Sequence, residues 1–227
     1  MDWLAGTWAV FLKDLRLELR TRYAVNALLL FVASSLLLVV FAVGQENVNE
    51  RVASALLWIV IVFAAAVGLG RAFVAEEERG TVLLLQLHLR GSMVYAGKLL
   101  FNVLLVGGMN ALAALGFIVV LGLEVEAPGL LAATLGLGAL GLAGATTLLS
   151  AIIARTANEG PLLAVLAFPM LVPLLLSVVR VTQRTLLLGA SAGPWAASVD
   201  DLVALGAYAG VVITASVLLF DYVWNDS

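Results

Sequence analysis

Long uncharged segments alternate with short charged ones along this chain. Six uncharged windows have 19 or more residues each: 23–45, 52–70, 99–123, 127–154, 160–179 and 202–220. A helix of roughly 20 residues crosses the hydrocarbon core of a bilayer. The pattern predicts membrane-spanning helices at about 25–44, 52–71, 99–122, 128–154, 160–179 and 201–221. A seventh window, 185–199, is shorter and contains the helix breakers of "GASAGPW", so we expect a loop there.

Residues 2–22 have a different period from the six windows. Large apolar residues fall on one helical face, and charged residues occupy the other positions. This pattern predicts an amphipathic helix that lies along the membrane interface. The alternative is a solvated helix that packs on a partner protein. The apolar face consists of Leu4, Trp8, Phe11, Leu15 and Leu19.

Composition supports the membrane interpretation. The chain has 227 residues, of which 63% are hydrophobic and 12% charged, and its mean hydropathy is +1.11. Soluble domains have about 25% charged residues. We therefore expect a single, all-α, integral membrane domain over residues 1–227. The first span follows a charged region and starts too late for a cleavable signal peptide, so we expect it to be retained.

The distribution of lysine and arginine predicts the orientation, because these residues favour the cytoplasmic side in short loops. Nine of the 12 fall before span one, between spans two and three, or between spans four and five. The alternate segments contain only Arg51, Arg180 and Arg184. We therefore expect a multi-pass protein of the cytoplasmic (inner) membrane with both termini in the cytoplasm. The absence of cysteine excludes disulfides and thiolate metal sites.

The span interiors contain no ionisable side chain, which argues against a proton-coupled or sodium-coupled carrier. Asn102 and Asn110 lie on one face of span three, where we expect hydrogen bonds between helices. Residues 136–141, "GLGALG", match a dinucleotide-binding pattern, but they lie in the middle of an apolar window. Small residues allow helices to approach closely, so we assign Gly138, Gly141 and Ala145 to helix packing.

Span five contains two prolines, Pro169 and Pro173. Each proline removes a backbone donor and bends a helix. The freed carbonyl groups need neighbouring groups in a bilayer, so we expect this span to pack inside the bundle. The bend is either a static shape or a moving hinge, and we favour the static shape.

The stretch "GSMVYAGKL" resembles a phosphate-binding loop but does not fit it. Five residues separate the glycines, and Leu99 stands where a hydroxyl should bind magnesium. We therefore expect no enzyme activity in this chain. If ATP drives the protein, the ATPase is another chain.

Residues 75–97 form a polar element between spans two and three, on the expected cytoplasmic side. An acidic cluster is followed by a nine-residue apolar run, which is too short to span and too hydrophobic for a solvated loop. We expect a short surface helix that docks a soluble partner, although it could instead cover the protein's own cytoplasmic end. The expected coupling residues are Glu76, Glu77, Glu78, Arg79, Gly80, Thr81, Leu84, Leu85 and His88.

Several motifs in this order resemble one family. They are "RAFVAEEERGTVLLLQL", the "GK" before span three, the glycine-rich fourth span, and "LLAVLAFPMLVPLLL" with its two prolines. The chain resembles the permease subunits of type-2 ABC exporters and, within them, the CcmB family, the haem exporter protein B of cytochrome c maturation. The resemblance covers nearly the whole chain.

The resemblance implies a complex with a CcmA-like ATPase, CcmC-like and CcmD-like membrane proteins, and a CcmE-like haem chaperone. ATP would bind the partner ATPase, and the complex would handle haem. Haem iron takes histidine, methionine, cysteine or tyrosine ligands. The only histidine, His88, is expected on the cytoplasmic side, and Met109 and Met170 lie in spans. We therefore expect no cofactor bound by this chain itself.

A homodimer is expected, since an ABC transporter needs two membrane halves and this chain supplies one. Contacts with membrane lipid are expected, and contacts with nucleic acid are not. One alternative is a type-2 ABC permease for a drug, lipid or polysaccharide. A second is a membrane scaffold or intramembrane enzyme that has no ATPase partner.

Overall fold

The computed structural model describes residues 2–44, 48–69, 89–153, 159–187 and 193–225. Within these ranges all regular structure is helical, which confirms the all-α prediction. The helices are α1 (Trp3–Thr21), α2 (Tyr23–Val43), α3 (Glu50–Leu69), α6 (Gly91–Leu121), α7 (Pro128–Ile153), α8 (Glu159–Leu186) and α9 (Pro194–Asn225).

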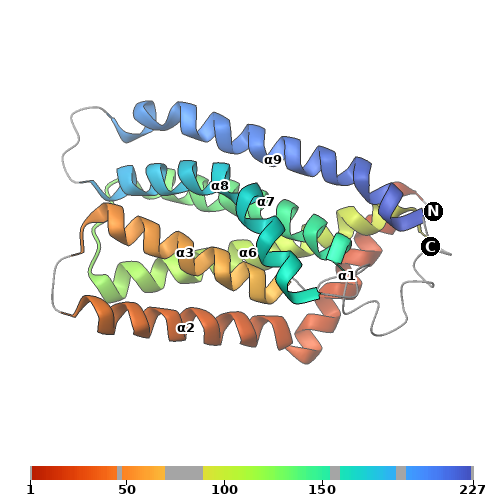
Figure 1. Cartoon of the computed structure of the whole chain (residues 1–227), viewed down its shortest axis with the longest axis horizontal. Helices are drawn as coiled ribbons and strands as arrows, with labels where there is room; N and C mark the ends of the chain where they lie inside the picture. Colours follow the sequence, from red (N-terminus) through yellow and green to blue (C-terminus); the bar gives the residue numbers. More distant parts are fainter. Residues whose placement is uncertain (1, 45–47, 70–88, 154–158, 188–192, 226–227) are drawn as a thin grey trace.

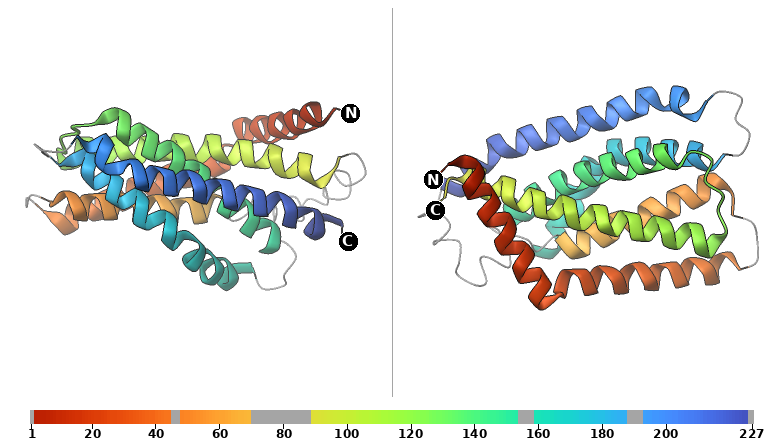
Figure 2. Two further views of the ribbon diagram at one scale, coloured as in Figure 1. Left: turned by 90° about the horizontal axis from the view of Figure 1, so that it is seen from above. Right: turned by 180° about the vertical axis from the view of Figure 1, so that it is seen from behind.

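The helices after α1 form an elongated bundle, and α1 crosses one end of it (Figure 1). Figure 2 shows α1 running obliquely past the first turns of α6 to an elbow, from which α2 starts back along the bundle. Arg22 forms this elbow with a left-handed backbone conformation (φ 52°), and its N–H donates to the Glu18 carbonyl. The start of α1 and the end of α9 lie at the same end of the molecule.

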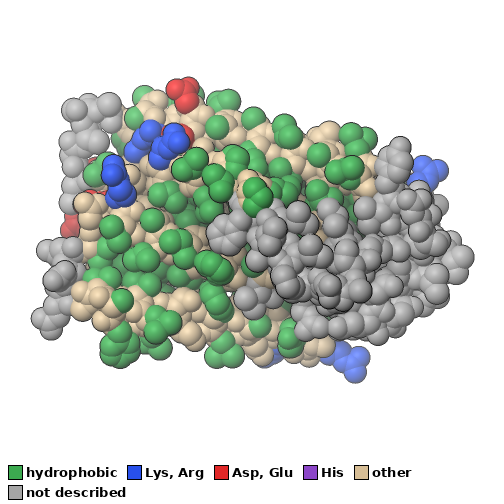
Figure 3. All heavy atoms as spheres, viewed as in Figure 1, with side chains coloured by type: hydrophobic (Ala, Val, Ile, Leu, Met, Phe, Trp, Pro, Cys, Tyr) green, Lys and Arg blue, Asp and Glu red, His purple; other side chains and the backbone are tan. Residues whose placement is uncertain are grey.

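The surface and the helix lengths fit a membrane protein. Four of the described helices, α2, α6, α7 and α9, are long and apolar enough to cross a bilayer. Many large apolar side chains point outward, including Leu30, Phe41 and Val119, which are 69%, 83% and 77% exposed. On the face in Figure 3, the visible charged side chains lie toward the ends of the bundle, and apolar side chains predominate on the part between them that is not grey.

Trp58 of α3 lies at the centre of the bundle. Its side chain is fully buried, and its Nε1 donates a hydrogen bond to Oγ1 of Thr182 on α8 at 2.8 Å. The indole lies directly against Gly138 of α7, where a Cβ atom would stand 2.9 Å from Cζ3. Gly138 therefore lets α7 approach α3 across this ring.

The other two small residues singled out on α7 face different helices. A Cβ atom at Gly141 would stand 2.6 Å from Leu174 Cδ1 on α8 and 3.2 Å from the ring of Tyr208 on α9. Ala145 is fully buried in the same core. Small residues on α7 thus lie where α3, α8 and α9 converge on it.

The two asparagines of α6 form hydrogen bonds with α7. Asn102 Nδ2 donates to Thr147 Oγ1 at 2.7 Å, and Asn110 Nδ2 donates to the Leu135 carbonyl at 3.2 Å. Both side chains are almost fully buried. The prediction of hydrogen bonds between helices at these positions is confirmed.

Pro169 and Pro173 both lie inside α8. Figure 1 shows that the early turns of α8 run obliquely to its later turns. The carbonyl of Met170, between the two prolines, accepts a hydrogen bond from the Tyr208 hydroxyl of α9 at 2.8 Å. A neighbouring helix therefore satisfies a backbone group near the prolines. The role of the prolines in bending stays a prediction.

The loop prediction for 185–199 is wrong at both ends. Helix α8 continues to Leu186, and α9 begins at Pro194. Proline suits the first turn of a helix, because its fixed φ is helical and its missing N–H would have no partner inside the helix. The carbonyl of Gly193 accepts a hydrogen bond from the N–H of Ala197. Pro194 thus starts a helix here instead of breaking one.

The last part of the predicted polar element 75–97 is helical. Helix α6 begins at Gly91 and passes through Lys98 without interruption. Lys98 suggested a membrane boundary because a charge is costly in an apolar environment. In the structure this charge is buried and paired with a carboxylate of α1.

The Gly138–Trp58 contact leads to a test with opposite outcomes at two glycines of α7. Gly138→Ala should destabilise the protein by about 1–3 kcal/mol, because the methyl group overpacks a rigid, hydrogen-bonded indole. Gly136→Ala is the matched control, because a Cβ atom there meets nothing within 4 Å. This control should be neutral or stabilising by up to about 1 kcal/mol through helix propensity. Thermal unfolding in detergent would measure both, and equal effects would contradict the assignment.

Candidate functional site

The predicted coupling residues lie outside the described part of the chain. These residues are Glu76, Glu77, Glu78, Arg79, Gly80, Thr81, Leu84, Leu85 and His88. The structure describes the point where this segment leads into the bundle. Leu89 and Arg90 precede α6, and Arg90 is its extended N-cap residue. At its C-terminal end the segment is continuous with the first turns of α6.

These first turns of α6 are packed tightly against α1. We call this contact the α1–α6 junction, which comprises Gly6, Thr7, Val10 and Asp14 of α1 and Met93, Gly97 and Lys98 of α6.

Two glycines permit the close approach at the junction. A Cβ atom at Gly97 would stand 2.7 Å from the Thr7 carbonyl oxygen and 2.6 Å from Val10 Cβ. A Cβ atom at Gly6 would stand 2.7 Å from Met93 Sδ. Real Cβ atoms do not approach other atoms so closely, so any larger residue at Gly97 would push the two backbones apart.

A buried ion pair spans the junction. Lys98 Nζ lies 3.3 Å from Asp14 Oδ2, with side-chain exposures of 3% and 9%. Lys13 Nζ lies 3.1 Å from the other carboxylate oxygen, Asp14 Oδ1, and is more exposed. Burying a charge is expensive unless it is paired. Moving α1 away from α6 would leave the Lys98 ammonium without this carboxylate.

The face of α1 that packs on α6 differs from its large apolar face. Gly6, Thr7, Val10 and Asp14 are buried. Leu4, Trp8 and Leu19 are 75%, 56% and 67% exposed. An interfacial helix needs such an outward apolar face to enter the acyl region. The small and polar face of α1 therefore joins the bundle, and much of the apolar face points outward.

The same turns of α6 also contact α9. The rings of Tyr95 and Phe220 lie 5.4 Å apart, and both side chains are fully buried. At the start of the junction, Trp3 Nε1 donates to Ser92 Oγ at 3.3 Å. The first turns of α6 thus pack against both α1 and the last part of α9.

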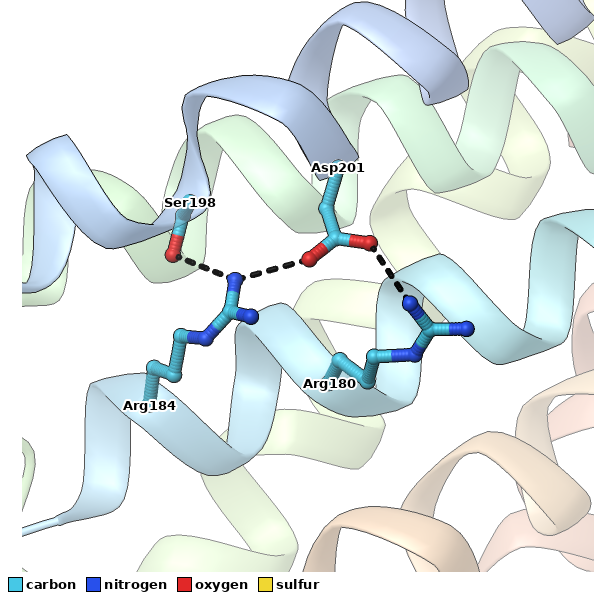
Figure 4. Close-up of polar contacts among 4 residues, drawn as sticks. All are labelled: Arg180, Arg184, Ser198 and Asp201. Carbon is cyan, nitrogen blue, oxygen red and sulfur yellow. Dashed lines mark hydrogen bonds and ion pairs between the residues drawn. The ribbon is translucent and has the colours of Figure 1, made fainter.

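A second polar cluster lies near the opposite end, between α8 and α9 (Figure 4). Asp201 accepts from Arg184 Nη1 at 2.7 Å and from Arg180 Nη1 at 3.4 Å, and Arg184 also donates to Ser198 Oγ. Asp201 is nearly buried, whereas the Arg180 side chain is 57% exposed. This cluster joins the two helices at the end away from α1.

The chemistry of the described residues is that of packing and ion pairing. The described ranges contain no group of three or more histidine, aspartate or glutamate side chains that could hold a metal ion. Met109 is buried in α6, and Met170 is partly buried in α8. The distinctive feature of the described part is the charged, closely packed junction directly after the predicted coupling segment.

These features define the class of protein to which the chain belongs. The chain is a multi-pass, all-helical membrane protein whose N-terminal helix crosses the end of the bundle. The family model described as CcmB protein matches residues 5–221. Heme exporter protein B of Bradyrhizobium diazoefficiens is 30% identical over 181 residues, which cover 78% of this chain and 81% of the relative. The chain belongs to the CcmB family.

Sequence reasoning missed the junction for an identifiable reason. In the sequence, Asp14 is one of several charged residues of an amphipathic period, and Lys98 directly precedes an uncharged window. Gly6 and Gly97 could have indicated this contact, because small residues allow two helices to approach closely. The pairing itself spans 84 positions in the sequence and depends on the elbow at Arg22.

The ion pair predicts strong coupling in a double-mutant cycle. Asp14→Leu should destabilise the protein by about 1–3 kcal/mol, because a buried ammonium loses a carboxylate partner. Adding Lys98→Met should restore much of this loss, giving a coupling energy of roughly 1–3 kcal/mol. Unfolding in detergent, followed by circular dichroism, would measure the cycle.

Lys13→Met is the matched control, since Lys13 contacts the same carboxylate from a more exposed position. It should change stability by about 1 kcal/mol or less. Additive effects of the Asp14 and Lys98 substitutions would show that the pair does not join the helices.

Proposed function

We propose that this chain is the membrane permease subunit of an ABC transporter complex for cytochrome c biogenesis. It would couple ATP hydrolysis by a separate ATPase to haem export or to release of a haem chaperone. Membership of the CcmB family and similarity to a heme exporter protein B support this function. The observation that carries the mechanism is the tight α1–α6 junction directly after the coupling segment.

The proposed mechanism starts at residues 75–88, where a CcmA-like ATPase would dock. Its movement would pass through Leu89 and Arg90 into α6, which has 31 residues and is about 46 Å long. Helix α6 packs against α1, α2, α3, α7 and α9. A displacement of its first turns would therefore move α1 and α9 together with it. Close packing favours such rigid transmission, because packed interfaces deform little.

The proposed topology has six spans, with both termini on the cytoplasmic side of the inner membrane and a type-2 exporter arrangement. Helices α3 and α8 would join α2, α6, α7 and α9 as spans. Both lie in the bundle, where α3 packs against α2 and α8, and α8 packs against α7 and α9. The charge asymmetry of the sequence supports this orientation.

The proposed complex contains a CcmA-like ATPase, CcmC-like and CcmD-like membrane proteins, and a CcmE-like haem chaperone. Two copies of this chain would supply the two membrane halves. The chain itself would be neither an enzyme nor a haem-binding subunit. Met109 lies on α6 and lines an apolar crevice, whereas Met170 lies on α8, directly after Pro169. Neither arrangement favours axial ligation of haem by this chain alone.

The topology can be tested with single cysteines, since the native chain has none. Asn49→Cys and Glu124→Cys are exposed positions expected outside the cytoplasm, and Asp2→Cys and Arg90→Cys are exposed positions expected inside. In spheroplasts, a membrane-impermeant maleimide should label only the first pair, and permeabilisation should expose the second. Labelling of Asp2→Cys in sealed spheroplasts would contradict the proposed orientation.

Reversal of the acidic cluster tests ATPase coupling. Glu76→Lys/Glu77→Lys/Glu78→Lys should reduce co-purification of the ATPase by about tenfold or more, because like or misplaced charges at an interface cost several kcal/mol. The control neutralises three acids near the other end, Glu50→Gln/Glu124→Gln/Glu126→Gln. It should leave the complex intact. Normal ATPase recovery and normal cytochrome c maturation in the lysine variant would refute coupling through this segment and favour a scaffold.

A further inference from the structure

An apolar crevice of about 370 Å³ lies where α1, α2 and α6 meet. Leu15 and Leu19 of α1 form one side, and Leu28 and Leu29 of α2 form the second. Helix α6 forms the third side, with Met109 among its lining residues. In the right-hand view of Figure 2, α1 and α2 diverge from their elbow, and α6 runs from near the start of α1 to near the end of α2.

The crevice has the size and lining of a site for a flexible apolar ligand. Ligand pockets in proteins span roughly 300–1,000 Å³. Among the described residues that line it, Glu18 is the single ionisable one. Apolar cavities do not hold water and bind apolar molecules. Leu19, Leu104 and Leu112 at its edges are 67%, 54% and 43% exposed, so the crevice is open to the surroundings.

Those surroundings identify the occupant. Helices α2 and α6 are long and apolar enough to cross a bilayer, so a space between them faces lipid. The apolar face of α1 points to the same side, since Leu15 and Leu19 belong both to that face and to the crevice. An interfacial helix of this kind lies at the boundary of headgroups and acyl chains. The crevice therefore extends from this boundary toward the acyl region.

The end of the crevice at the elbow carries charge. The carboxylate of Glu18 accepts a hydrogen bond from the N–H of Val25 at 2.8 Å, which anchors the first turn of α2. Arg22 lies between Leu19 and Val25 in the chain, and its side chain is exposed. Arginine suits a phosphate group, because its guanidinium can donate two parallel hydrogen bonds.

From these observations we infer that the crevice binds a membrane phospholipid. One acyl chain lies between α1, α2 and α6, and the phosphate lies beside Arg22. This lipid fills the angle of the elbow and supports the last turns of α1, beyond the α1–α6 junction. The inference does not depend on haem transport or on an ATPase partner.

Gly108 provides a direct test. It lines the crevice, and a Cβ atom there meets nothing within 4 Å, so a leucine side chain would occupy the ligand's space. Gly210→Leu on α9 is the matched control, because a Cβ atom there also meets nothing within 4 Å and Gly210 does not line the crevice. The full chain would be purified in detergent and titrated with dioleoyl phosphatidylglycerol under native mass spectrometry.

The native chain and Gly210→Leu should retain one tightly bound phospholipid. Gly108→Leu should weaken that binding by about tenfold or more, because several methylene groups lose their burial. Leu29→Trp would fill the crevice from α2 and should weaken lipid binding in the same way. This second variant provides the test if Gly108→Leu does not fold. Arg22→Gln should weaken lipid binding less than Gly108→Leu does, because it removes only the contact with the phosphate. Equal lipid binding by the native chain and both filled variants would overturn the inference, as would an absence of bound lipid in the native chain.

Discussion

The buried ion pair between Asp14 and Lys98 is the constraint on which the arrangement of this molecule depends. A lysine within an apolar helix is costly unless a carboxylate accompanies it. Here the carboxylate comes from a helix that lies across the bundle instead of along it. This ion pair and the close contacts at Gly6 and Gly97 hold α1 against the first turns of α6. Because α2 follows α1 directly at Arg22, the position of α1 also sets the start of the next helix.

The two ends of the bundle are joined in different ways. At one end, the α1–α6 junction and the Tyr95–Phe220 contact tie together helices from the beginning, middle and end of the chain. Near the other end, Asp201 joins α9 to the two arginines of α8. Helix α6 runs through the bundle between other helices and begins where the predicted coupling segment ends. An apolar crevice lies between α6 and the elbow of α1 and α2.

Much of the fold followed from local pattern. The uncharged windows and the amphipathic period of residues 2–22 predicted the helices of the bundle and the transverse helix. Helix ends were less accurate, because charge was used to mark them. Lys98 ends the charged stretch before span three, but α6 already begins at Gly91, and Pro194 reads as a helix breaker in the sequence but starts α9. In both cases a residue with two possible roles was assigned by its commoner one.

What the sequence determined by itself is the class: a polytopic helical membrane protein, with asparagines that join helices, and a family resemblance that rests on motif order. Hydropathy and period suffice for this, since a backbone in lipid must satisfy its own hydrogen bonds within helices. Only the tertiary structure decided which charges meet and which face of α1 packs inward. It also revealed the space between α1, α2 and α6. The physical reason is that the α1–α6 ion pair joins residues 84 positions apart in the chain and the crevice lies between three helices, so neither follows from local pattern.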